Sequence, residues 1–146
     1  METLEHDLIA FLAARLAEDE AAAKAAQLRF PGPWDRAVTP DSPLPSAVSL
    51  YDSLDESFGV IRGSYAAAHI ARHDPARVLR EVEAKRAIMA AHPAADDEGQ
   101  LFCSTCVSDA ELYDEEFGAG RWPCVTVRAL IAVYSDHPDY RQEWAP

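Results

Sequence analysis

Three cysteines constrain the fold of this 146-residue chain more than any other feature of its sequence. Cys103 and Cys106 are separated by two residues, and Cys124 follows after a further seventeen, directly behind Pro123. Two thiolates at the spacing C-x2-C can reach one metal ion, and structural zinc is held by four Cys or His ligands in a tetrahedron. The pattern therefore predicts a structural zinc site that still needs one ligand.

A histidine is the natural fourth ligand, because imidazole nitrogen and thiolate sulfur are the donors that structural zinc prefers. His92 is our first choice, since it lies eleven residues before Cys103 at the end of a predicted helix. The alternatives, in order, are His137, His73 and His69. A competing interpretation is that His92 only ends a helix at the surface.

The cysteines have three other interpretations. They could be reduced, buried apolar side chains, or a redox pair, although no thioredoxin-type strand precedes them. They could also hold a catalytic zinc ion, with Glu98, Asp109 or Glu111 orienting a water molecule. We favour structural zinc, because catalytic sites normally carry fewer sulfur ligands and a well-placed general base.

No other pattern in the chain predicts a catalytic or cofactor-binding residue. The serines lack the G-x-S-x-G setting of a nucleophile elbow, and no glycine-rich phosphate loop occurs. His69 and His73 stand four apart, as paired metal ligands on a helix do, but without the glutamate of H-E-x-x-H. We expect a structural role for them, with one ring turned inward and the other at a helix junction.

The formal net charge of −12 limits the partners that the chain can bind. Affinity for nucleic acid comes largely from Lys and Arg side chains that displace counterions, so this balance argues against nucleic-acid binding. Eight acidic residues and no Lys or Arg fall between Asp96 and Glu116. This acidic region is either a solvated surface or a contact surface for a charged partner.

The chain has no apolar stretch long enough for a membrane span and no basic segment at its N-terminus. Three cysteines, two of them in C-x2-C, also differ from an oxidised disulfide framework. We therefore expect a cytoplasmic protein that does not enter a membrane.

Hydrophobic periodicity predicts an α+β fold in one domain, 1–146, with three main helices, a small antiparallel sheet and a zinc-knuckle-like C-terminal segment. The expected parts are an N-terminal helix at 1–29, a loop and small sheet at 30–63, and helices at 64–92. Residues 93–146 hold the cysteines, a last helix and an aromatic tail. Within them, residues 124–134 fit either a helix or a strand.

Three local expectations bear on the core. The helical stripe of the N-terminal segment predicts either an internal core or a homodimer contact, through Leu4, Leu8, Phe11, Leu12 and Leu16. Tyr65 is expected to face inward from the helix that starts at Ser64. Asp74 and Pro75 suit the N-cap and first position of the next helix.

Several segments resemble a known family. They are the opening Leu8-Ile-Ala-Phe-Leu-Ala-Ala-Arg-Leu16, the stretch from His69 to Arg86, and the closing segment from Tyr134 to Trp144. Together with the Gly-Pro-Trp turn at 32–34 and the Pro-Cys pair at 123–124, they resemble an uncharacterised actinobacterial family, common in Streptomyces and their phages, described only as a domain of unknown function. A more distant similarity is to phage early proteins of the Ead type. The resemblance implies a helix at 124–134 and an accessory role linked to mobile DNA, and it assigns no active site.

These observations favour a non-enzymatic, zinc-stapled accessory or interaction protein whose partner is another protein. The first alternative is a small metal-dependent enzyme that uses the same Cys and His cluster. The second alternative, based on charge alone, is an acidic mimic of nucleic acid that inhibits a DNA-binding protein.

Overall fold

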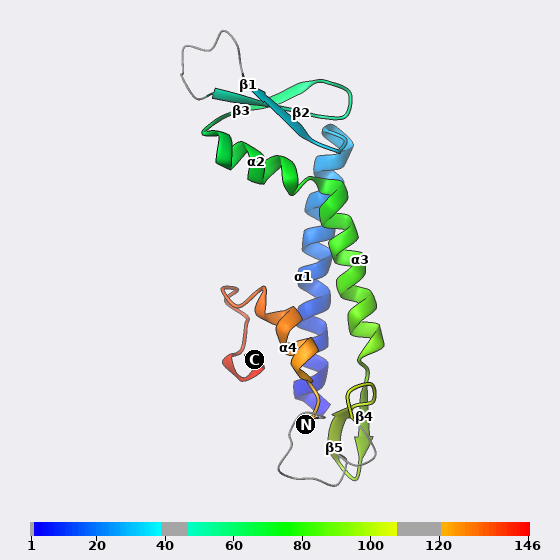
Figure 1. The fold of residues 1–146 in the computed structure, drawn as a ribbon. Coiled ribbons are helices and arrows are strands. Elements are labelled where there is room, and N and C mark those ends of the chain that lie inside the picture. Colours follow the sequence, from blue (N-terminus) through cyan, green and yellow to red (C-terminus); the bar gives the residue numbers. More distant parts are fainter. Residues whose placement is uncertain (1, 39–46, 108–120) are drawn as a thin grey trace. The chain divides into compact units, whose positions relative to one another are not determined.

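The computed structural model describes residues 2–38, 47–107 and 121–146. The elements, in chain order, are α1 (Glu2–Arg29), β1 (Asp35–Val38), β2 (Ala47–Tyr51), β3 (Ser57–Arg62), α2 (Ser64–Arg72), α3 (Pro75–Ala91), β4 (Ala94–Asp97), β5 (Gln100–Cys103), α4 (Val125–Ala132) and the 3-10 turn η2 (Gln142–Trp144). This is the expected α+β class, with a second small sheet that the sequence did not predict (Figure 1).

The chain forms two compact units. One comprises Met1–Leu16 and Glu83–Pro146, and the other comprises Ala17–Val82. The helices α1 and α3 each contribute to both. The assignment of the whole chain to one domain stays a prediction. In the part of the chain that the structure describes, no helix is both long and apolar enough to cross a bilayer.

The second unit contains an antiparallel sheet in the order β1-β2-β3 (Figure 1). Val48 and Leu50 of the central strand are buried and form a core with Ala67 of α2. Because alternate residues of a strand share one face, this pair turns the same face of β2 toward the helix. Ala67 is fully buried, whereas Tyr65 is 91% exposed, so the expectation of an inward Tyr65 is wrong.

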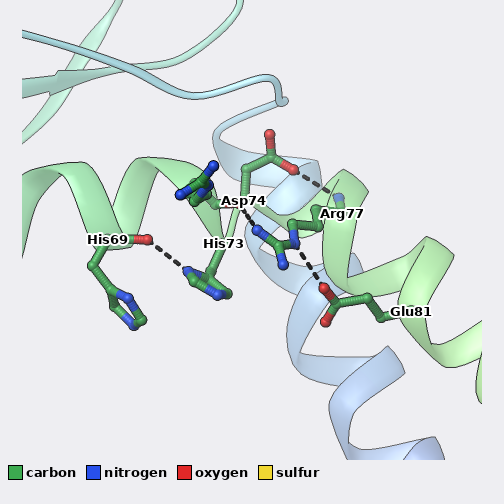
Figure 2. A network of polar contacts seen from close by, with 6 residues as sticks. His69, His73, Asp74, Arg77 and Glu81 are labelled. Carbon is green, nitrogen blue, oxygen red and sulfur yellow. Dashed lines mark hydrogen bonds and ion pairs between the residues drawn. The ribbon is translucent and has the colours of Figure 1, made fainter.

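The helix α3 begins where Asp74 and Pro75 predicted. The Asp74 carboxylate accepts a hydrogen bond from the backbone N–H of Arg77 at 2.7 Å, which satisfies a donor that the first turn leaves unpaired (Figure 2). Arg77 in turn forms an ion pair with Glu81 at 2.7 Å on the same helix face. The helix ends before His92 and Pro93, as expected, because proline cannot continue it.

The first unit has a core that joins the start of α1 to the C-terminal third of the chain. Leu8 and Phe11 of α1 pack with Val127 and Ile131 of α4, and with Trp144 of the tail. This internal core confirms the predicted stripe of α1 for the residues whose side chains are described. The homodimer through this helix stays a prediction.

Residues 124–134 are helical at α4, which settles the choice between helix and strand. The Arg128 guanidinium on this helix donates hydrogen bonds to the backbone carbonyls of Pro123, Glu143 and Ala145. These bonds hold the tail next to α4, and Trp144, which is 3% exposed, lies 5.1 Å from the Phe11 ring. The tail therefore folds back onto the unit.

The hairpin β4–β5 is the element that the sequence did not reveal. Its register pairs Ala94 with Cys103, and its two-residue turn is Glu98-Gly99. Both turn residues have positive φ, as a type I′ turn requires. The Asp96 carboxylate accepts a hydrogen bond from the Gly99 N–H and supports the turn.

The cap of α3 provides a test of the fold. Replacing Asp74 with alanine removes the acceptor for the Arg77 N–H, so we expect the free energy of unfolding to fall by about 1 kcal/mol in urea titrations. The control Asp74→Asn keeps a capping oxygen and should stay within a few tenths of a kcal/mol of the natural protein. Equal loss in both variants would show that the carboxylate acts through its charge rather than as a cap.

Candidate metal centre

Four side chains converge at the C-terminal end of α3. They are His92, Cys103, Cys106 and Cys124, and their ligand atoms all lie within 4.8 Å of one another. The Nδ1 atom of His92 lies 3.4 Å from the Cys103 sulfur, 3.4 Å from the Cys106 sulfur and 3.7 Å from the Cys124 sulfur. In the described ranges, no other group of three or more such side chains comes together in this way.

These distances match a tetrahedral metal shell. Bonds of ~2.3 Å from zinc to sulfur and ~2.0 Å to nitrogen, at the tetrahedral angle, place a sulfur and a nitrogen about 3.5 Å apart. The three observed distances lie close to this value, and they involve Nδ1 of the His92 ring throughout. The cluster can therefore hold one metal ion through three sulfurs and one nitrogen.

The end of α3 positions His92. The His92 backbone N–H bonds to the Met89 carbonyl at 3.1 Å, and Pro93 then ends the helix. The Trp122 indole N–H donates to the His92 carbonyl at 3.3 Å. The imidazole thus projects from a backbone that is fixed on both sides.

The hairpin and the turn behind it position Cys103 and Cys106. Cys103 ends β5, and its carbonyl accepts hydrogen bonds from the N–H groups of Cys106 and Val107, at 3.1 and 3.0 Å. This tight turn brings the Cys106 sulfur back toward the Cys103 sulfur, so that both can bind one ion, as the C-x2-C spacing predicts. Ser104 ties the turn to α3 through its N–H, which donates to the Pro93 carbonyl at 3.2 Å.

Cys124 immediately precedes α4. Its carbonyl accepts the N–H of Arg128 at 2.9 Å, and the next inward residue, Val127, is fully buried in the core. Because the first N–H groups of a helix have no partner within it, a thiolate at this position is stabilised. The third sulfur is therefore supplied by the element that also fills the core.

The surroundings of Cys106 and Cys124 shift the pKa values of these two thiols in opposite directions. Burial, with hydrogen bonds and charge repulsion from Cys103 and Cys124, raises the pKa of Cys106 to about 12. Burial also acts to raise the pKa of Cys124. The backbone N–H groups of Val127 and Thr126, with the two other thiols, outweigh burial and lower that pKa below its usual value. Without a metal ion, Cys124 therefore ionises more readily than Cys106.

The burial of the four residues is uneven. Cys103 and Cys124 are 0% and 1% exposed, whereas His92 and Cys106 are half-buried. All three cysteines are free thiols. Two sulfurs thus face the core, and the remaining two ligands form the outer side of the cluster.

The other histidines considered as ligands lie elsewhere. His137 packs edge-on against Phe11, with ring centroids 5.4 Å apart, and its Nδ1 lies 3.3 Å from the Arg15 guanidinium. His69 and His73 contact each other on α2. Of the acids proposed to orient a water, Glu98 is an exposed turn residue outside the cluster, and Asp109 and Glu111 lie outside the described residues.

Sequence reasoning missed the residues that support the cluster. Trp122 anchors the carbonyl of His92, and the Thr105 hydroxyl donates to the carbonyl of Ala91. The signal for Trp122 was its place in Trp-Pro-Cys, directly before the third sulfur. Nothing in the local sequence marked Thr105 beyond its position inside C-x2-C.

Comparisons with known proteins give the chain a family but no role. A family model described as "Family of unknown function (DUF6221)" matches residues 5–146. No curated protein and no solved structure matches the chain. The geometry of the cluster is therefore the main guide to function.

The choice of His92 can be tested against the runner-up ligand. We expect His92→Gln to weaken zinc binding by more than the roughly 10–100-fold that is typical of changes outside the ligand shell, because it removes a ligand. Competition with a chromogenic chelator measures this affinity. The matched variant His137→Gln should bind zinc as the natural protein does. Equal weakening by both changes would exclude His92 as the specific fourth ligand.

Proposed function

This chain belongs to a family of unknown function (DUF6221), and from its own residues we propose that it is a non-enzymatic accessory protein stapled by a structural zinc ion. The observation that carries the proposal is the complete set of four ligand atoms at the end of α3. Three thiolates and one imidazole form a donor set that suits zinc better than calcium or magnesium, which prefer oxygen.

The position of the ligands supports a staple. They come from the end of α3, from the turn after β5 and from the residue before α4, which are far apart in the sequence. An ion bound to all four would link Cys106 to Cys124 and hold α4 against the core. Metal binding then adds directly to folding free energy, by on the order of 10 kcal/mol in small zinc modules.

The same geometry argues against the metal-dependent enzyme. Catalytic zinc normally keeps three protein ligands and leaves one position for water. Here four side chains fill the tetrahedron, and the part of the chain that the structure describes adds no carboxylate to the cluster. The ion would have no position at which to bind and polarise a substrate.

For the contact with a partner, we propose the tip of the β4–β5 hairpin. Asp96, Asp97 and Glu98 are all exposed there, at the start of the acidic region, and the zinc ion would brace the base of the hairpin at Cys103. A rigid, acidic loop suits a basic protein surface. An accessory role linked to mobile DNA is what the resemblance to phage early proteins of the Ead type implies, and the location that we propose is the cytoplasm.

Cobalt substitution tests the closed shell. Tetrahedral Co²⁺ with three thiolate ligands absorbs in the visible range, and its bands shift when an outside ligand binds. We expect the cobalt-loaded protein to give a tetrahedral spectrum that excess azide leaves unchanged. A shift with azide would reveal an open position and favour the enzyme. Loss of the spectrum in Cys106→Ser, but not in Ser104→Ala, would confirm the ligand set.

The acidic tip is tested by a double substitution. Asp97→Asn with Glu98→Asn removes two charges and keeps the turn, because asparagine before glycine is favoured in type I′ turns. We expect affinity purification from the native host to recover at least several-fold less of a basic partner. The control Glu83→Gln with Asp136→Asn makes the same change in charge at other exposed positions and should recover as much as the natural protein. Equal recovery with both variants would remove the hairpin tip from the interface.

A further inference from the structure

Two histidines outside the cysteine cluster share one exposed face of α2. His69 lies in the last turn of the helix and His73 is its C-cap residue. Their ring centroids lie 4.2 Å apart with a tilt of 38° between the planes, and both residues are exposed (Figure 2). The expectation that one of the rings is buried is therefore wrong.

A hydrogen bond to the backbone holds the His73 ring in one orientation. Its Nδ1 lies 2.8 Å from the backbone carbonyl oxygen of His69. A carbonyl oxygen can only accept, so Nδ1 must carry the hydrogen and the lone pair of the neutral ring must lie on Nε2. Histidines that bind metals commonly donate their second ring N–H to such a backbone carbonyl, which fixes both tautomer and orientation.

The backbone around the pair is held by several hydrogen bonds. The His73 N–H bonds to the carbonyls of His69 and Ile70, at 3.2 and 3.1 Å. Beyond it, the Asp74 carboxylate is engaged with the Arg77 N–H, and the Arg77 guanidinium with Glu81 and the Arg72 carbonyl (Figure 2). The Asp74, Arg77 and Glu81 side chains are thus engaged in these bonds, and the two imidazoles are the ligands that we consider on this face.

We propose that His69 and His73 form a second, exposed binding site for a divalent transition-metal ion of the kind that prefers imidazole, such as Zn²⁺, Ni²⁺ or Cu²⁺. Residues four apart on a helix are neighbours on its surface, so two imidazole nitrogens can bind one ion. The remaining positions on the ion stay open to water or to a donor from another molecule, unlike those of the Cys3His centre.

Calorimetric titration of the protein, as purified, with Ni²⁺ tests this site. We expect one equivalent of Ni²⁺ to bind at the pair. His73→Gln and His69→Gln should each weaken this binding at least about tenfold, because each leaves a single imidazole and removes the higher affinity that two linked ligands give. His6→Gln, which removes another exposed histidine from α1, should leave the affinity unchanged. Circular dichroism checks that the variants fold, as their exposed positions predict.

The proposal is wrong if the natural protein and both variants bind Ni²⁺ equally, or if His6→Gln causes the same loss. Zinc retained or released at the cysteines is followed separately by metal analysis. Because the natural protein and the variants share the same cysteines, nickel that binds at a zinc-free cluster appears equally in all of them, and the histidine pair is assessed from the difference between them.

Discussion

The first unit depends on the convergence of three sulfurs on one nitrogen of His92. His92 follows α3, Cys103 ends β5, Cys106 lies in the turn behind it and Cys124 precedes α4, so one bound ion would fix the relative positions of α3, the β4–β5 hairpin and α4. A metal ion is a common solution for small folds of this kind, since ligand binding becomes part of the folding free energy.

Other contacts extend from this centre along the chain. Cys124 leads into α4, whose Val127 and Ile131 complete the core that Leu8 and Phe11 of α1 begin. Arg128, on the same helix, holds the carbonyls of the tail. The position of the third sulfur is therefore coupled to that of the last residues of the chain. Loss of the proposed ion would therefore loosen α4 and the tail together rather than the cysteine turn alone.

Local chemistry made part of this arrangement predictable. The C-x2-C spacing and the proline after His92 marked the ligands, and the proline after Asp74 marked the start of α3, because each reflects a rule that acts over a few residues. The β4–β5 hairpin was missed because Ala94 and Ala95 lead into two exposed acids, with no alternation of apolar residues, and because its turn has glutamate before Gly99 where asparagine or aspartate is usual.

The errors on α2 have a related cause. In a helix of only nine residues, several alanines compete for the inward face, and Ala67 rather than Tyr65 lies against the sheet. That rotation of the helix also places both histidines outside, where they contact each other. Packing against β2 decides which face of this short alanine-rich helix turns inward. A local sequence pattern does not encode that packing.

X-ray absorption at the zinc edge of the protein, purified without added metal, tests the central claim most directly. The account predicts one zinc ion with three sulfur neighbours at ~2.3 Å and one nitrogen at ~2.0 Å, and no oxygen in the first shell. Protein that folds without zinc, or a first shell with fewer than three sulfurs and a water oxygen, would contradict it.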